Sequence, residues 1–234
     1  MNAKDAPAES TGSGLAGAVL AGGRSRRMGT DKALLVEGGR TLLARALEAL
    51  SDHGNHVDAG LFVASGAAPR YASIAAGLGA VEVHDDPRWG LDAGPLAGLE
   101  AALVAAQARG AQRLCVLACD MPNVCARTIG RLVELSRGAD IAFACDDRFD
   151  HPLLGVYSVR CAPAIRASLE RGERRMDSYF SALATDGTPL VLARIPVGRL
   201  ADDIARAARL CDNLNRPADL ARALERARSV SVAP

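Results

Sequence analysis

The sequence has few aromatic residues and no excess of either charge. Phe, Trp and Tyr make up 3% of its 234 residues, and the formal net charge is +1 at pH 7. The scarcity of aromatic side chains argues against a base-stacking platform for single-stranded nucleic acid. A near-neutral chain has no general field that would attract DNA or an anionic membrane, so any anion must be bound locally. We therefore expect neither a nucleic-acid partner nor a membrane partner.

Long apolar runs and targeting signals are also missing. No hydrophobic stretch approaches the ~20 residues that a transmembrane helix needs. Residues 1–14 are rich in Ala, Ser, Gly and Pro and lack a basic start followed by an apolar segment. We interpret them as a disordered N-terminal tail rather than a secretory signal. The sequence thus predicts a cytoplasmic protein in which residues 15–230 form one domain.

The six cysteines form no C-x-x-C pair, and the four histidines form no H-E-x-x-H motif. Neither zinc nor a disulfide framework is therefore expected. The glycine-rich segment after the first apolar run, residues 20–32, matches neither G-x-x-x-x-G-K-[ST] nor G-x-G-x-x-G. This mismatch argues against a P-loop and against an NAD-binding dehydrogenase.

Short apolar runs alternate with segments of helical spacing over the first two thirds of the chain. The expected strands are residues 17–20, 61–64, 81–83, 113–118, 141–144, 151–159 and 191–195. The expected helices are residues 41–50, 71–78, 95–109, 128–135, 164–171, 177–184 and 217–228. This alternation predicts βαβ units and a mostly parallel sheet covered by helices on both faces. Ligands of such sheets bind at the carboxyl ends of the strands.

Residues 20–32, which read LAGGRSRRMGTDK, follow the first expected strand. Gly22 and Gly23 let the backbone approach a ligand closely, and successive N–H groups in such a turn form an anion-binding concavity. Lys32 is one of only two lysines, and the other, Lys4, lies in the expected tail. In a chain so biased toward arginine, this position suggests a need for a compact ammonium group. We predict a phosphate site; a solvated surface turn is the alternative.

Carboxylates follow two later strands. Asp120 comes directly after an apolar run, and Mg²⁺ typically takes one or two carboxylates together with phosphate oxygens. Capping of the following turn is the other interpretation. Asp85 and Asp86 could accept hydrogen bonds from a guanine edge or a ribose hydroxyl, or could form the turn before Pro87.

The second half of the chain offers weaker candidates. Arg174 and Arg175 could bind a second anion or begin a solvated helix. The amides of Asn213 and Asn215 could read the edge of a heterocycle or cap a helix. His151 begins the expected strand at residues 151–159.

In order along the chain, these segments resemble the molybdenum cofactor guanylyltransferase family. The segments are LAGGRSRRMGTDK at 20–32, GPLAGL at 94–99, CDMP at 119–122, HPLLGVY at 151–157, GERR at 172–175 and NLNRPADL at 213–220. The first motif alone would indicate only the wider nucleotidyltransferase superfamily, whereas the ordered set is far more specific. Two departures stand out: Ala64 or Ser65 replaces a frequent asparagine, and Arg216 replaces a threonine.

The resemblance implies a three-layer α/β/α sandwich, Rossmann-like and of the nucleotide-diphospho-sugar transferase type. It implies GTP and Mo-molybdopterin as substrates, Mg²⁺ as cofactor, and molybdoenzymes or their chaperones as possible recipients of the product. The N-terminal part would bind GTP and the C-terminal part molybdopterin. We further expect a monomer.

The implied residue roles follow from the same motifs. Lys32 and Asp120 would be catalytic, and Asp120 would also bind Mg²⁺. GTP would be bound by Leu20, Ala21, Gly22, Gly23, Lys32, Asp86 and Asp120. Of the two adjacent aspartates, Asp86 is favoured over Asp85. Molybdopterin would be bound by His151, Arg174, Arg175, Asn213 and Asn215.

The expected reaction is transfer of GMP from GTP to the terminal phosphate of Mo-molybdopterin. Two alternatives stay open: a cytidylyltransferase of the same superfamily, acting on the molybdenum cofactor or on a sugar or polyol phosphate, and a non-catalytic GTP-binding regulator. Relatives that use CTP tend to read L-A-A-G where this chain has LAGG, so Gly22 favours guanine.

Overall fold

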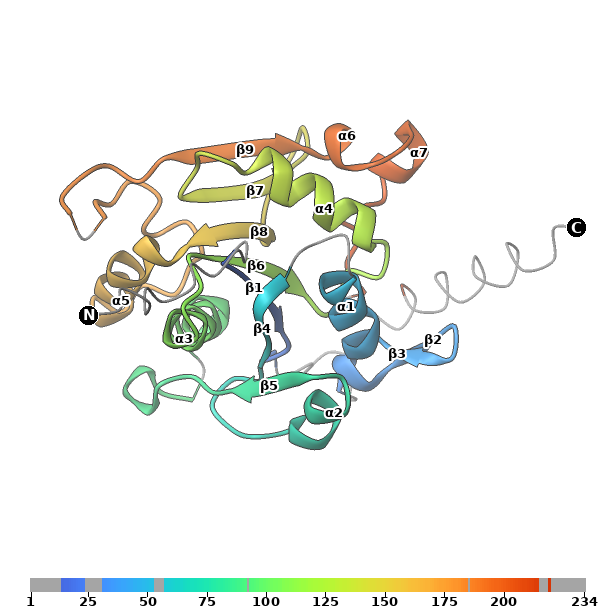
Figure 1. The fold of residues 1–234 in the computed structure, drawn as a ribbon, viewed down its shortest axis with the longest axis horizontal. Coiled ribbons are helices and arrows are strands. Elements are labelled where there is room, and N and C mark those ends of the chain that lie inside the picture. Colours follow the sequence, from blue (N-terminus) through green and yellow to red (C-terminus); the bar gives the residue numbers. More distant parts are fainter. Residues whose placement is uncertain are drawn as a thin grey trace, which may run out of the picture.

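The computed structural model describes residues 14–23, 31–52, 57–91, 93–184, 186–214 and 219. A seven-stranded sheet of order β5-β4-β1-β6-β8-β7-β9 forms its centre (Figure 1). Its strands are β1 (Leu15–Leu20), β4 (Val57–Ala64), β5 (Ala80–Val83), β6 (Arg113–Ala118), β7 (Ile141–Cys145), β8 (Asp150–Ser158) and β9 (Leu192–Pro196). A separate hairpin pairs β2 (Val36–Glu37) with β3 (Arg40–Thr41).

Helices connect most of these strands. The α-helices are α1 (Leu42–Ser51), α2 (Ala72–Gly77), α3 (Gly94–Ala108), α4 (Ala126–Leu135), α5 (Ala162–Glu170), α6 (Val197–Leu200) and α7 (Ile204–Ala207). Short 3-10 helices are η1 (Lys32–Leu34), η3 (Pro87–Trp89) and η4 (Val159–Cys161). Thr41 caps α1, because its Oγ1 accepts a hydrogen bond of 3.1 Å from the N–H of Ala44.

The central strands are apolar along their whole length because both faces of the sheet are covered. In β1, Ala16, Ala18 and Leu20 pack with α3 and α5, whereas Leu15 and Val19 pack with α1, α2 and α4. Alternate residues of a strand point to opposite faces, so six consecutive apolar residues serve two cores. Figure 1 shows α3 and α5 on one side of the sheet and α1 and α4 on the other. The predicted three-layer α/β/α arrangement is confirmed.

Strand direction decides which residues meet at the edge of the sheet. β1 pairs in parallel with β4 and β6, β4 with β5, and β7 with β9. β8 runs antiparallel to both of its neighbours, β6 and β7. The start of β8 therefore lies beside the carboxyl ends of β6 and β7, which brings His151 and Leu153 to the edge that carries Asp120.

The helix expected over residues 177–184 is wrong. This segment consists of successive turns, in which the N–H of Phe180 donates to Asp177 O (3.3 Å) and that of Ala182 to Tyr179 O (2.9 Å). Tyr179 is fully buried, and the ring of Phe180 stacks on Phe143 at 5.1 Å between centroids. The hydrogen bonds within this segment run from residue i+3 to residue i, so they close single turns and do not form the i+4 to i ladder of an α-helix.

Several predictions concern residues that the structure does not describe. They are residues 1–13 of the expected tail, residues 24–30 of the glycine-rich segment, Asn215, Arg216 and all but Asp219 of the expected helix 217–228. Within the described residues, no helix is both long enough and apolar enough to cross a membrane.

Candidate functional site

A cavity of about 410 Å³ opens at the carboxyl edge of the sheet. Its walls come from the ends of β1, β4 and β6, the start of α3, η1 and the first part of β8. The lining residues are Leu20, Ala21, Gly22, Gly23, Asp31, Lys32, Ala33, Ala64, Gly66, Asp85, Leu91, Ala93, Gly94, Pro95, Gly98, Ala118, Cys119, Asp120 and Leu153. The structure thus brings together six of the seven residues that the sequence assigned to GTP, all except Asp86.

The floor of the cavity is a close crossing of two backbones. The N–H of Ala21 donates to Ala64 O (2.8 Å), which extends the pairing of β1 and β4 into the loops that follow. A Cβ atom on Gly22 would lie 3.0 Å from the nitrogen and 3.1 Å from the Cα of Gly66. Gly66 itself has a φ of 86°, a region that favours glycine. Sequence reasoning missed Gly66, although an apolar strand followed by Ser-Gly was a detectable signal.

Lys32 and Asp120 meet across the cavity. The Nζ of Lys32 lies 3.3 Å from Oδ2 of Asp120, and the side chains are 16% and 20% exposed. Lys32 is the first residue of η1, and Asp120 follows β6, so the pair joins segments 88 residues apart. The ion pair keeps both charges compensated in a partly dehydrated place, where either charge alone would be costly.

Of the two adjacent aspartates, the structure puts Asp85 in the cavity wall and leaves Asp86 outside the lining. Asp86 caps η3 and forms an ion pair with Arg88 (2.7 Å), so its carboxylate is already engaged. Asp85 is 7% exposed, and its Oδ1 is buried without a hydrogen-bond partner among the described residues. Burial, followed by the nearby Glu100 carboxylate, raises the pKa of Asp85. The structure thus places Asp85, and not Asp86, in the cavity wall, whereas the sequence favoured Asp86 as the residue that contacts GTP.

Asp31 and Tyr71 form a second polar contact that sequence reasoning missed. The hydroxyl of Tyr71 donates to the carboxylate of Asp31, with O···O distances of 2.7 and 2.9 Å. The same carboxylate caps η1 by accepting from the N–H of Ala33 (3.1 Å). Burial and the bond to Asp31 raise the pKa of Tyr71 far above its usual value, so the hydroxyl keeps its proton and acts as a donor.

Beside the cavity, His151 and Asp146 form a pair at the β7–β8 connection. His151 Nε2 lies 2.7 Å from Oδ2 of Asp146, whose other oxygen accepts the N–H groups of Arg148 and Phe149. The hydrogen bond to His151 is the main reason that the pKa of Asp146 falls to about 2. Because Asp146 is ionised, Nε2 of His151 must carry a proton. Neither side chain lines the cavity.

The other described residues that were assigned to molybdopterin, Asn213, Arg174 and Arg175, each have different surroundings. Asn213 is exposed, and the next residue, Leu214, donates its N–H to Asp120 O (3.0 Å), so this segment contacts the turn that follows β6. Arg174 donates to the carbonyl oxygens of Leu169 and Glu173. Arg175 is 84% exposed on its side chain and pairs with Asp177. None of them lines the cavity.

The described lining fits a divalent cation only in partnership with a phosphate ligand. It carries three carboxylates (Asp31, Asp85, Asp120) and one ammonium group. No group of three or more His, Cys, Asp or Glu side chains among the described residues could hold a metal by itself. Burial raises the pKa of the neighbouring thiol, Cys119, to about 12, so it stays neutral. Mg²⁺ binds readily to one or two carboxylates plus phosphate oxygens, and Asp120 suits that pattern.

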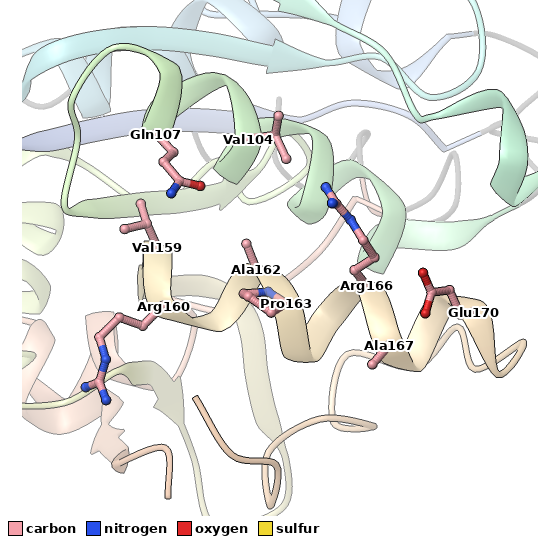
Figure 2. Close-up of a pocket in the computed structure, with 9 residues that line it drawn as sticks. All are labelled: Val104, Gln107, Val159, Arg160, Ala162, Pro163, Arg166, Ala167 and Glu170. Atoms are coloured by element: carbon pink, nitrogen blue, oxygen red, sulfur yellow. The ribbon is translucent and has the colours of Figure 1, made fainter. Parts of the chain in front are cut away.

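A second cavity, of about 350 Å³, lies between α3 and α5 and contains none of the predicted site residues (Figure 2). Its wall is largely small and aliphatic. Both of its arginines are already paired: Arg166 donates to Glu100, and Arg160 to Asp140 and Asp186. In Figure 2 the guanidinium group of Arg160 points away from the other labelled side chains. This cavity lacks free charge for a phosphate.

Fold and cavity together define an α/β protein with a cavity at the carboxyl edge of a mostly parallel sheet. Residues 17–186 match the family model described as MobA-like NTP transferase domain, and the chain belongs to this family. This membership confirms the resemblance noted in the motifs.

Named relatives agree with this assignment. The chain is 40% identical over 188 residues to a probable molybdenum cofactor guanylyltransferase of Opitutus terrae, covering 77% of this chain and 85% of that protein. It is 34% identical over 220 residues to the molybdenum cofactor guanylyltransferase of Bradyrhizobium sp. (strain ORS 278), covering 89% and 99%. The crystal structure of molybdopterin-guanine dinucleotide biosynthesis protein A from Archaeoglobus fulgidus has the same fold, with a TM-score of 0.69, 24% identity and coverage of 91% and 98%.

Proposed function

We propose that the protein transfers GMP from GTP to the terminal phosphate of Mo-molybdopterin, forming Mo-molybdopterin guanine dinucleotide and pyrophosphate. The observation that carries the proposal is the Lys32–Asp120 pair across a cavity at the carboxyl edge of the sheet. Relatives named as guanylyltransferases support the choice of substrates. Molybdoenzymes or their chaperones would receive the product.

In the proposed reaction, an oxygen of the acceptor phosphate forms a bond to the α-phosphorus of GTP. The bond from that phosphorus to the bridging oxygen of the β-phosphate breaks, and pyrophosphate leaves with the electron pair. A phosphate nucleophile is already ionised near neutral pH, so no general base is required. Catalysis then depends on positioning and on stabilising charge.

Each polar group of the cavity has a role in this scheme. Lys32 would exchange part of its contact with Asp120 for the β- and γ-phosphates, where negative charge grows as the leaving group departs. The glycine backbone at residues 22–23 would lie along the phosphates, because no side chain stands between it and the cavity. Asp85 would accept hydrogen bonds from the base or the ribose.

We also propose that the reaction depends on Mg²⁺ held by Asp120. When bound, the ion would neutralise charge on the phosphates. Among the described lining residues, Asp120 is the carboxylate that pairs with the ammonium group of Lys32, which puts it within reach of phosphates bound by Lys32.

The acceptor would approach from the side of β8, where His151 lies at the same edge of the sheet as Asp120, and where Leu214, the neighbour of Asn213, donates to Asp120 O. Of the residues assigned to molybdopterin, these two have the better support from geometry. Arg174 is occupied by backbone carbonyl groups, and Arg175 extends into solvent. His151, with its Nε2–H held by Asp146, can present a second N–H to a phosphate when it is protonated.

The decisive experiment measures pyrophosphate release with each of the four nucleoside triphosphates, with and without molybdopterin and Mg²⁺. We expect release only with GTP, molybdopterin and Mg²⁺ together. Preference for CTP would support the cytidylyltransferase alternative. GTP binding without pyrophosphate release would support a regulator instead.

The metal assignment has its own test. Asp120→Asn keeps the side-chain volume but removes the charge, and turnover should fall by a factor on the order of 10²–10³. Asp186→Asn is the matched control, because Asp186 pairs with Arg160 at the opposite edge of the sheet. Near-normal turnover of Asp120→Asn at saturating Mg²⁺ would contradict the role assigned to Asp120.

A further inference from the structure

Residues 65–71, which connect β4 to α2, contact both ends of the glycine-rich motif; we call them the brace. At one end Gly66 meets Gly22 backbone to backbone. At the other end the Tyr71 hydroxyl bonds to Asp31 and lies 3.4 Å from Ala21 O. The brace therefore contacts the motif near its beginning, at Ala21 and Gly22, and near its end, at Asp31.

The position of the Tyr71 hydroxyl is set by the sheet. The Tyr71 side chain is 1% exposed and packs in the core that α1, α2 and α4 share with the sheet. On β5, Glu82 Oε1 accepts the N–H groups of Arg70 (2.6 Å) and Tyr71 (2.9 Å). Arg70 in turn donates to Ser65 O (2.6 Å), which closes the brace on itself. The hydroxyl is thus a fixed donor.

Asp31 links the Tyr71 hydroxyl to Lys32, whose ammonium group we propose to bind the phosphates. The Asp31 carboxylate accepts from Tyr71 and from the N–H of Ala33, so it is held at the first turn of η1. Lys32 begins that turn. Without the hydroxyl, Asp31 keeps the cap and a distant Arg70 (3.9 Å), and its 26% exposed side chain can turn to solvent. The first turn of η1 would then lose its anchor to α2 and β5 and keep only the Lys32–Asp120 pair and the buried Ala33 as anchors to the sheet.

We propose that Tyr71 is a positioning residue: its hydroxyl fixes Asp31, and through Asp31 the start of η1, so that Lys32 faces the triphosphate. This inference rests on the proposed function, since it assumes that Lys32 binds the β- and γ-phosphates. The expected signature is dependence on phosphate number, because only a nucleotide that reaches Lys32 senses its position. A merely structural role of Tyr71 would weaken the binding of all guanine nucleotides alike.

The test compares the affinities of GTP and GMP for the wild type and for Tyr71→Phe, which keeps the ring and removes the hydroxyl. We expect GTP binding and kcat/KM for GTP to fall about 10- to 100-fold, the range for one hydrogen bond to a charged group. GMP binding should not change. The control is Tyr179→Phe, which removes the hydroxyl of a fully buried tyrosine on the opposite face of the sheet. It should bind both nucleotides as the wild type does.

Asp31→Asn gives an independent measurement, and it answers the question if Tyr71→Phe does not fold. If Asp31 acts only by its charge, removing a carboxylate beside a polyanion would tighten GTP binding. If Asp31 acts by positioning, GTP binding weakens despite the lost repulsion, and GMP binding stays the same. The double variant should bind GTP no more weakly than the single variant that has the lower GTP affinity. Both changes break the same hydrogen bond, between Tyr71 and Asp31, so their effects should not add.

Four outcomes would overturn the inference: no loss in Tyr71→Phe, equal losses for GTP and GMP, tighter GTP binding by Asp31→Asn, or additive losses in the double variant. Failure of the proposed function has a different appearance. In that case the wild type itself would not prefer GTP to GMP or would release no pyrophosphate. A wild type that turns over GTP, with Tyr71→Phe equal to it, would refute the inference alone.

Discussion

The crossing of Gly22 and Gly66 gives a prediction whose size follows from the structure. In Gly22→Ala the new methyl group would lie 3.0 Å from the Gly66 nitrogen and 3.1 Å from its Cα. The neighbouring atoms are backbone, so the two loops must separate by a few tenths of an ångström. Such overpacking costs about 1–3 kcal/mol. Loss of glycine's freedom in the unfolded chain offsets about 0.4–1 kcal/mol of this cost.

The net loss for Gly22→Ala is therefore about 1–2 kcal/mol, or roughly 2–8 °C in Tm for a chain of this size. Gly23→Ala is the matched control for stability, because its methyl group would meet nothing within 4 Å. Neither glycine has a positive φ, so backbone strain does not enter the comparison. Gly23→Ala should have an unchanged or slightly raised Tm.

The assay is thermal and urea unfolding of both variants without nucleotide, followed by pyrophosphate release with GTP. Separating the loops displaces the phosphate-binding backbone, and kcat/KM for Gly22→Ala should fall about 100-fold. Equal unfolding midpoints for the two variants would refute the steric argument. A lowered Tm with unchanged kcat/KM would show that the crossing stabilises the fold without positioning the phosphates.

Three further predictions concern charged groups. Asp85→Asn should raise the KM for GTP about 10-fold or more, whereas Asp86→Asn should not. Folding raises the pKa of Asp85, so the contribution of this group to stability is lost as pH rises through the raised pKa. Without nucleotide, Asp85→Asn should therefore have a higher Tm than the wild type at pH 7. This difference in Tm should disappear as the pH falls toward 3.8, the ordinary pKa of the group. Lys32→Met should lower kcat/KM for GTP about 10²–10³-fold. Lys32→Arg should lower it less, because arginine keeps the positive charge but presents a planar guanidinium group in place of the compact ammonium group. Asp146 has its pKa lowered to about 2, mainly by His151, so Asp146→Asn should unfold more easily than the wild type above pH 3.8, and urea titrations should converge as pH falls to about 2.

Local sequence patterns were sufficient to predict most of the strands and helices. Two-sided burial makes β1 and β6 continuous apolar runs, and such runs are visible without any partner. Thr41 marks the start of α1, because a side-chain cap acts within a few residues. The alternation of these elements was enough to predict the α/β class. It also put Lys32 and Asp120 on one edge of the sheet, since parallel strands end on the same side.

Other features depend on contacts between segments distant in the sequence. Only the structure shows which of Asp85 and Asp86 lines the cavity. The two are neighbours of the same residue type, and packing against α3 buries Asp85 alone. Residues 177–184 form turns instead of the expected helix, and both Tyr179 and Phe180 pack in the core that contains Phe143 of β7. The reversed direction of β8 set His151 at the edge of the sheet that carries Asp120, and strand direction leaves little trace in residue types.

The sequence by itself determined the fold class, the glycine-rich motif that we propose binds phosphate, and the carboxylate opposite it, because each is encoded in a few consecutive residues. Only the tertiary structure decided how that motif is held. Gly66 and Tyr71 lie about forty residues from the segments they support. A backbone crossing and a buried hydroxyl have no signature in the local sequence, because their meaning comes from the partner that folding brings to them.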